Sequence, residues 1–160
     1  PALSSALLPA AYPKGKVIKD VKTNAVYKVT GTLVVQYVKP LNKKRSTITI
    51  PEQVTLNRYN YKVTSIGVKA FKNNKYLKKI TVGKNIKAIG SQAFYNCKKL
   101  KVIKFRTTQL KQKYIGSNAF KKMPSKMTVY VPKKQAKYYK FIEKMLINIT
   151  FMHLYTVLCT

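Results

Sequence analysis

The chain contains 160 residues, of which 33 are lysine or arginine and only 3 are aspartate or glutamate, so its formal net charge is +30. Hydrophobic residues make up 46% of the sequence, which excludes a disordered basic tail and indicates a folded domain with a lysine-covered surface. The carboxylates Asp20, Glu52 and Glu143 and the single histidine, His153, do not lie at spacings typical of a catalytic or metal-binding site. We therefore expect no enzymatic activity, no catalytic residues, no metal site and no cofactor.

Residues 1–13 carry no charge, and Lys14 follows them. The small residues at positions 4–6 resemble the cleavage site of a secretory signal peptide, so residues 1–15 are interpreted as a leader or a signal-peptide remnant. A disordered apolar leader is the alternative interpretation. No stretch reaches the roughly 18 apolar residues that a membrane-spanning helix needs, so we expect no transmembrane segment.

Residues 16–62 alternate strand-like runs with turn signals at Thr30-Gly31 and Pro40-Leu41-Asn42. Tyrosine and valine dominate the runs, and both favour β-structure. The predicted strands are 25–29, 32–38, 46–50 and 61–64. We expect residues 16–62 to form an N-terminal β cap, built as a hairpin or meander, together with the first strand unit.

A repeat organises the next part of the chain, in residues 63–132. Three segments align as SIGVKAF (65–71), AIGSQAF (88–94) and YIGSNAF (114–120), and in the first two an apolar residue recurs 6, 9 and 11 positions after the phenylalanine. One such unit cannot bury its own apolar face, whereas stacked units can. The pattern therefore predicts a solenoid.

Each repeat also contains a short strand, because apolar residues lie two positions apart at 48/50, 80/82, 103/105 and 129/131. The repeated glycine is expected to supply a tight turn or a close approach of two backbones. The Ala-Phe step predicts a short helical turn that packs over the strand. The longer spacing between Val54 and Ile66 predicts an insertion before the first Ile-Gly pair.

The recurring pattern IGxxAFxxCxxLxxIxIPxxVxxIG resembles the BspA-type (Treponema-type) leucine-rich repeat. It reads AIGSQAFYNCKKLKVIKF and SIGVKAFKNNKYLKKITVGKNIKAIG in this chain, and the resemblance covers roughly residues 47–131. The resemblance implies a β-rich α/β solenoid, a leucine-rich-repeat array of short parallel strands, in a secreted or surface-attached bacterial protein. It also implies adhesion to host or matrix proteins or to other bacteria.

The C-terminal part contains two different segments. Residues 133–146 follow Pro132 and have apolar positions at helical spacing, so they predict an amphipathic helix that covers the last repeat. Residues 147–160 form an atypical tail without lysine. A frameshift is the preferred interpretation of this tail, and an apolar closing strand over residues 147–158 is the alternative. Neither His153 nor Cys159 is expected to be a site residue.

The candidate binding residues lie between the two inward residues of each predicted strand. They are Thr49, Thr81, Lys104 and Tyr130. On a solenoid these positions align as an exposed row across the strands, with hydroxyl, cationic and aromatic side chains. We predict that this row contacts a macromolecule of a host, matrix or bacterial surface; an ordinary solvated strand face is the alternative.

The charge suggests two other functions. One is a structural module held on an anionic cell-wall polymer by charge alone, and the other is a non-specific nucleic-acid binder. Thirty of the 33 cations are lysines, whereas bidentate contacts to phosphate and guanine favour arginine, so we expect no specific nucleic-acid recognition. The function predicted from the sequence is non-catalytic protein–protein or cell adhesion at a bacterial surface.

Overall fold

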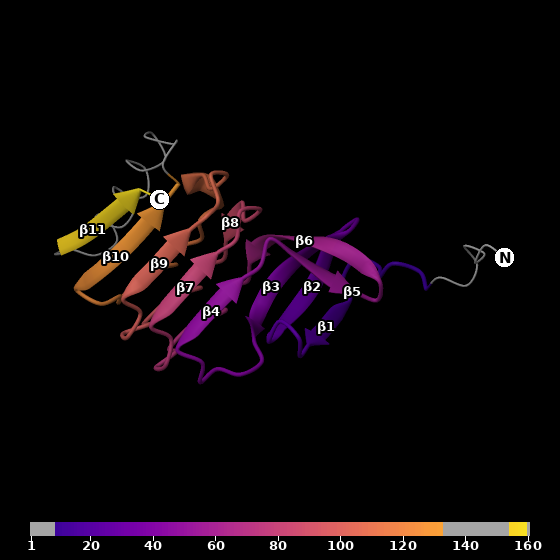
Figure 1. Cartoon of the computed structure of the whole chain (residues 1–160), viewed down its shortest axis with the longest axis horizontal. Helices are drawn as coiled ribbons and strands as arrows, with labels where there is room; N and C mark the ends of the chain where they lie inside the picture. Colours follow the sequence, from indigo (N-terminus) through magenta and orange to yellow (C-terminus); the bar gives the residue numbers. More distant parts are fainter. Residues whose placement is uncertain (1–8, 133–153, 160) are drawn as a thin grey trace.

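The structure is a computed structural model that describes residues 9–132 and 154–159. Antiparallel strands at one end are followed by a row of parallel strands at the other (Figure 1). One sheet has the order β1-β2-β3-β6-β5, with β8 also paired to β6, and the other has the order β11-β10-β9-β7-β4. Apart from these strands, the described residues contain the short 3-10 helix Gln112–Tyr114 and no α-helix.

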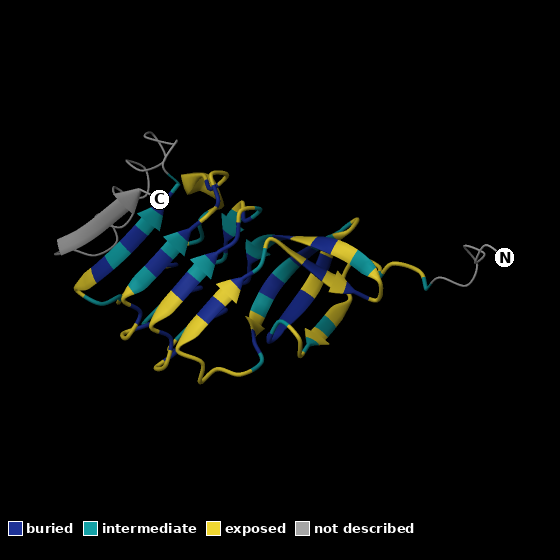
Figure 2. Ribbon diagram, viewed as in Figure 1, coloured by how far each residue is buried: buried dark blue, intermediate teal, exposed yellow. Residues whose placement is uncertain are grey.

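The second sheet is the row of repeat strands predicted from the apolar pairs. Its strands are β4 (Thr47–Ile50), β7 (Lys79–Val82), β9 (Val102–Phe105), β10 (Lys126–Val131) and β11 (Leu154–Cys159). All neighbouring strands in this sheet are parallel. Buried residues alternate with exposed or half-buried ones along β4, β7, β9 and β10 (Figure 2), because successive side chains of a strand point to opposite faces.

The first sheet contains the N-terminal strands. They are β1 (Val17–Asp20), β2 (Ala25–Gly31) and β3 (Val34–Pro40), which pair as antiparallel neighbours. The insertion predicted between Val54 and Ile66 forms an antiparallel hairpin of β5 (Gln53–Leu56) and β6 (Tyr59–Ile66). Strand β6 then pairs in parallel with both β3 and the short β8 (Ala88–Ile89), so it joins the N-terminal strands to the repeats.

The segment after each repeated glycine is a series of β-turns, and the predicted short helical turn is wrong. We call residues 67–74, 90–97 and 116–123 the repeat turns. In the first of them the amides of Ala70, Lys72 and Asn74 each bond a carbonyl three residues earlier. The residues two and six positions after each glycine have positive φ, between 55° and 60°: Lys69, Asn73, Gln92, Asn96, Asn118 and Lys122. This left-handed geometry interrupts a helix.

The positive φ values turn alternate amides of one repeat turn toward the next one. The amides at 69, 71 and 73 donate to the carbonyls at 91, 93 and 95, at 2.7 to 3.0 Å, and those at 92, 94 and 96 donate in the same way to 117, 119 and 121. Backbone groups inside a fold need partners, and these columns supply them between repeats. The repeat turns are therefore stacked by hydrogen bonds as regularly as the strands are.

The core lies between the strands and the repeat turns. Phe71, Phe94 and Phe120 are almost fully buried and stack at centroid distances of 5.2 and 5.3 Å, which is close to the spacing of neighbouring strands. Tyr37 of β3 continues this stack onto Phe71 at 5.6 Å, and Tyr27 of β2 contacts Tyr37 edge to face. One aromatic column thus connects the N-terminal strands with the repeats.

Close backbone approach, the second role expected for the repeated glycines, is the one observed. Gly90 has no positive φ, but a Cβ added to it would lie 2.6 Å from the carbonyl carbon of Gly67 in the preceding turn. A Cβ on Gly116 would lie 2.6 Å from Cα of Ser91. Only glycine lets the successive turns come this close.

The terminal segments of the chain add one strand at the C-terminal end and hydrogen bonds to β6 at the N-terminal end. The predicted helix over 133–146 and the cleavage site at positions 4–6 lie outside the described residues. The alternative interpretation of the tail was a closing strand over residues 147–158. Leu154–Cys159 forms the strand β11, which continues the parallel sheet beside β10, and residues 147–153 lie outside the described residues. Near the N-terminus, the amide of Tyr12 donates to the hydroxyl of Tyr61, and the hydroxyl of Tyr59 donates to the carbonyl of Pro9, both at 2.8 Å.

Candidate binding surface

The pairing registers place the four predicted binding residues in one row across the parallel sheet. Thr49 of β4 lies beside Thr81 of β7, Thr81 lies beside Lys104 of β9, and Lys104 lies beside Tyr130 of β10. Neighbouring strands are about 4.8 Å apart, so the row spans roughly 14 Å. We call these four residues the strand-face row.

A second row lies beside the first and was not singled out from the sequence. It consists of Thr47, Lys79, Val102 and Thr128, which the same registers place side by side. These residues lie two positions before the strand-face row, so they point to the same face. The strand periodicity already contained this signal. Together the two rows present four threonines, two lysines, one valine and one tyrosine.

The strand-face row becomes less exposed toward the C-terminal end. Thr49 is exposed, whereas Thr81, Lys104 and Tyr130 are half-buried between neighbours on both sides. A half-buried aromatic ring beside a lysine offers both contact area and charge, which is the type of residue pair that dominates many interfaces. Lys104 and Tyr130 are therefore the strongest candidates in the row.

Two hollows border this face. One, of about 340 Å³, lies at the junction with the N-terminal strands and is lined by Thr49 and Thr47 together with Lys22, Thr23, Asn24, Arg45, Ile48 and Pro51. The other, of about 330 Å³, lies near the carboxyl ends of the strands and is lined by Lys104 with Glu52, Lys84, Phe105, Arg106 and Pro132. Both linings contain cations, and the threonine hydroxyl groups belong to the first hollow.

The acidic residues of the described ranges have structural contacts. Glu52 forms an ion pair with Lys84 at 3.3 Å, with both side chains about half exposed. Asp20 accepts hydrogen bonds from the amide and the hydroxyl of Thr23 in the β1–β2 turn. Across residues 9–132 and 154–159, no group of three potential metal ligands occurs.

Positive charge dominates the surface because few carboxylates are present to neutralise it. Within the described part of the chain, the Lys84–Glu52 contact is the one ion pair. On the repeat turns, Lys72 and Lys122 both lie over the ring of Tyr95, at 5.3 and 5.4 Å from its centroid. The hydrogen bond with Lys122 lowers the pKa of the Tyr95 phenol, even though the partial desolvation of that group opposes the shift.

Cys97 lies in the core and is not available to a ligand. Its side chain is buried, and its thiol donates to the carbonyl of Phe71 at 3.0 Å. Burial raises the pKa of the thiol to about 12, so it is neutral at physiological pH. At the corresponding position of the previous repeat, Asn74 donates to the carbonyl of Lys43. Both side chains therefore bond the preceding coil.

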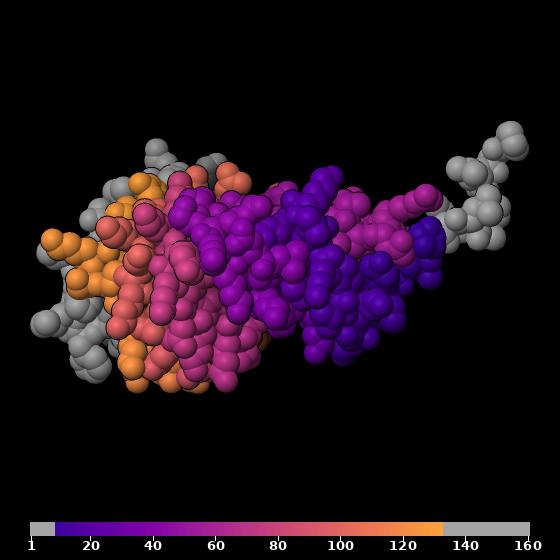
Figure 3. Space-filling model, turned by 90° about the horizontal axis from the view of Figure 1, so that it is seen from below, coloured from indigo at the N-terminus to yellow at the C-terminus, as the bar shows by residue number. Residues whose placement is uncertain are grey.

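Within the described residues, no helix is long and apolar enough to cross a membrane. The molecule is elongated, and its coils follow one another as layers along the long axis (Figure 3).

No curated protein matches the chain. Two solved structures share its fold. A leucine-rich cell surface protein from Faecalibacterium prausnitzii A2-165 matches with a TM-score of 0.62 and 23% sequence identity, over 92% of this chain and 44% of that protein. The pneumococcal vaccine antigen PcpA matches with a TM-score of 0.60 and 22% identity, over 76% of this chain and 34% of that antigen. The chain spans less than half the length of either protein.

The family model for the BspA type leucine-rich repeat region matches residues 42–158 in six copies. The match includes the repeats read from the sequence and extends into β11. This agrees with the parallel sheet, the stacked phenylalanines and the repeat turns. The chain therefore belongs to the BspA-type leucine-rich repeat family.

Proposed function

We propose that the protein is a non-catalytic adhesion module that binds a macromolecule at the bacterial cell surface through its strand face. The observation that carries the proposal is the alignment of Thr49, Thr81, Lys104 and Tyr130 in adjacent strands. Inward residues of a solenoid are committed to its core, so the regular face is what remains for a partner. The family, and the cell-surface description of the F. prausnitzii protein, support a secreted or surface location.

The partner is expected to be a host, matrix or bacterial surface protein. Threonine hydroxyls and a tyrosine ring offer directional contacts that do not depend on net charge. Lys104 adds a half-buried cation beside Tyr130, where an interaction is screened less than at a fully exposed residue. This combination favours a specific protein contact over attraction by charge alone.

The charge supports one second candidate, a module held on an anionic cell-wall polymer. A net charge of +30 attracts any polyanion, including nucleic acid, and such binding weakens steeply as salt is added. A specific contact through the strand-face row is expected to persist. Salt dependence therefore separates the two candidates.

The test compares two double variants that each lower the net charge by two. Lys104→Glu with Tyr130→Ala changes the strand-face row, whereas Lys98→Gln with Lys99→Gln changes two exposed residues that directly follow the second repeat turn. Binding is measured by surface plasmon resonance against matrix proteins and purified cell-wall polymer, at about 0.05 and 0.5 M salt. We expect the first variant to lose at least about 1 kcal/mol of binding and the second to change mainly the salt dependence. Equal losses would contradict the proposal.

A further inference from the structure

A third hollow, of about 360 Å³, lies where the N-terminal strands meet the first repeat turn. Its lining comes from the end of β3, from the loop that leads into β4, and from residues 69–76. It lies near the start of β4, whereas the hollow at Lys104 lies near the ends of the strands. It is therefore separate from the strand-face row and does not depend on the function proposed for that row.

Five lysines line this hollow: Lys39, Lys43, Lys69, Lys72 and Lys75. Among the residues that the structure describes, no carboxylate lines it. Asp20 and Glu52, the acidic residues of the described ranges, have their contacts elsewhere in the molecule. Lys72 is partly engaged, because its ammonium group donates to Oε1 of Gln92 at 3.0 Å. A concave site with this many cations and no internal counter-charge is a site for an anionic ligand.

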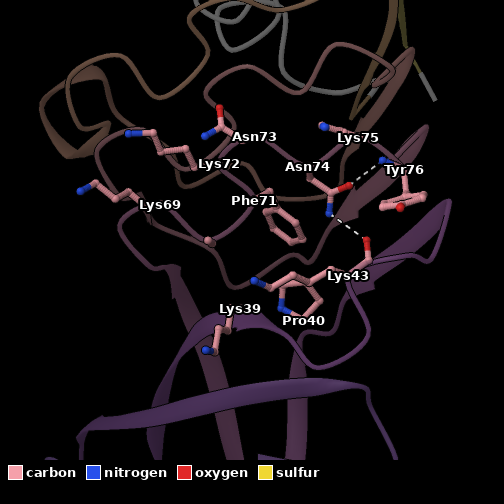
Figure 4. Close-up of a pocket in the computed structure, with 11 residues that line it drawn as sticks. Lys39, Pro40, Lys43, Lys69, Phe71, Lys72, Asn73, Asn74, Lys75 and Tyr76 are labelled. Atoms are coloured by element: carbon pink, nitrogen blue, oxygen red, sulfur yellow. Dashed lines mark hydrogen bonds between the residues drawn. The ribbon is translucent and has the colours of Figure 1, made fainter.

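The rest of the wall is apolar and aromatic. The ring of Phe71 lies in the middle of the hollow, with Pro40 below it and Tyr76 on the far side from Lys69 and Lys72 (Figure 4). Phe71 is 2% exposed, whereas Tyr76 is 46% exposed and presents its ring to a ligand. An exposed tyrosine ring offers amphipathic contact area at low cost in side-chain entropy.

Asn74 fixes the geometry of the wall. Its side-chain amide donates to the carbonyl of Lys43 at 3.1 Å, and its oxygen accepts from the amides of Tyr76 and Leu77 at 2.8 and 2.9 Å. These bonds join the loop before β4 to the first repeat turn, and Asn74 itself is buried. The hollow is therefore formed before a ligand arrives, which reduces the entropic cost of binding.

We infer that this hollow binds an acidic polysaccharide, with its carboxylate or sulfate groups on the lysines and a sugar ring on Tyr76. The volume lies within the range of small-ligand sites and so suits a short segment of a chain. Lysine presents a hydrated point charge on a flexible stem, which suits anionic groups dispersed along a polymer better than bidentate phosphate recognition. Binding of nucleic acid through stacking uses several aromatic platforms, whereas Tyr76 is the exposed ring of this wall.

The experiment uses two triple variants that remove equal charge. Lys43→Gln, Lys69→Gln and Lys75→Gln change the hollow, and Lys28→Gln, Lys62→Gln and Lys87→Gln change exposed lysines that line none of the three hollows. Lys69→Gln is compatible with the backbone, because Gln92 occupies the same position of the next repeat turn with φ 55°. Isothermal titration calorimetry with a sulfated, uronate-containing hexasaccharide at about 0.15 M salt gives the affinities.

We expect the first triple variant to bind the hexasaccharide at least about tenfold more weakly than the unchanged chain, and the control triple to stay within about threefold. Tyr76→Ala should weaken binding of the hexasaccharide and leave binding of linear polyphosphate unchanged. Equal losses in the two triple variants would overturn the inference, because the general field alone would then explain binding. Tyr76→Ala without effect on the hexasaccharide, or an unchanged chain that does not bind it, would also overturn it. Circular dichroism melting curves verify that each variant is folded.

Discussion

The N-terminal strands and the parallel repeats are stabilised in different ways. In β1, β2 and β3 the contacts are antiparallel pairs between strands close in sequence, and the core side chains include the tyrosines Tyr27 and Tyr37. In the repeats every strand and every turn bonds the equivalent element one coil away, and the core side chains are phenylalanines. The N-terminal strands are therefore stabilised by contacts within their own region, whereas each repeat is stabilised by hydrogen bonds and packing with the neighbouring repeats.

The aromatic column shows where the two kinds of core meet. Tyr37 stacks on Phe71 of the first repeat turn and contacts Tyr27 of β2. Its hydroxyl is buried and has no hydrogen-bond partner among the described residues, whereas the hydroxyl of Tyr27 bonds Thr23 at 2.8 Å. The stacking of Tyr37 on Phe71 therefore connects the two regions but leaves the hydroxyl of Tyr37 buried without a hydrogen-bond partner.

The largest effect is expected for Phe94→Ala, which removes the ring between Phe71 and Phe120. The substitution leaves a cavity in the stack, so the free energy of unfolding should fall by about 3–5 kcal/mol in urea titrations. Hydrogen exchange should show a greater loss of protection in the repeat turns than in β2. An equal loss of protection in β2 would mean that both regions unfold as one unit. That result would contradict the conclusion that the two regions are stabilised in different ways.

A smaller loss is expected for Gly90→Ala, because the new Cβ would meet the backbone of the preceding repeat turn. The turns would have to move apart, at a cost of about 3 kcal/mol in the free energy of unfolding. The matched control is Gly31→Ala in the N-terminal strands, where the nearest atom would be Cβ of Val34 at 4.0 Å. Urea titration of both variants measures the difference, and similar stabilities would refute the close-approach explanation.

Removing the unpaired hydroxyl should stabilise the junction. Tyr37→Phe keeps the stack on Phe71 and eliminates a buried group without a partner, so the free energy of unfolding should rise by about 1 kcal/mol. Tyr27→Phe is the control, because it removes a hydroxyl that bonds Thr23 and should lower stability by a similar amount. Thermal melts decide the sign, and a lower melting temperature for Tyr37→Phe would contradict the prediction.

The smallest effect is expected for the thiol of Cys97, which should not react while the repeats are folded. Burial raises its pKa to about 12, so the neutral form is favoured and the reactive thiolate is absent near pH 8. A thiol reagent added to a Cys159→Ser variant should react only after urea unfolds the chain. Because the folded-state pKa is the higher one, the thiol's contribution to stability is present below about pH 9 and is lost as the pH rises toward 12. Fast labelling at pH 8 would show that this repeat opens.

The repeat strands were predictable because two kinds of periodicity agree in the sequence. Apolar residues two positions apart set the face of each strand, and the repeat spacing sets which residues are neighbours, so the strand-face row could be named before the structure. Within the hairpin β5–β6, the strand predicted at 61–64 is part of β6, whereas the pairing with β5 was not predicted, because the length of an insertion does not show how it folds.

The repeat turns and the lysine-lined hollow were not predictable in the same way. Lys69 and Gln92 have positive φ, although their side chains do not favour that conformation, and the turn hydrogen bonds impose it. The glycines allowed two explanations, and only the distance between successive turns decides between them. The hollow joins Lys39 and Lys43 to Lys69 and Lys75 across the fold, and a charge count does not show which lysines converge.

The unequal spacing of the repeats shows which parts of the array can change in length during evolution. The distance along the chain is 23 residues from Ile66 to Ile89 and 26 from Ile89 to Ile115, yet both steps end in the same parallel pairing. The longer step contains the 3-10 helix Gln112–Tyr114, which lies between strand and turn and outside both stacks. Small insertions and deletions can therefore accumulate in this connector, whereas a change within a strand or a repeat turn shifts two columns of hydrogen bonds. A duplication or loss of one whole unit keeps both columns in register, so recombination between repeats can change the length of the array and leave the N-terminal strands as they are.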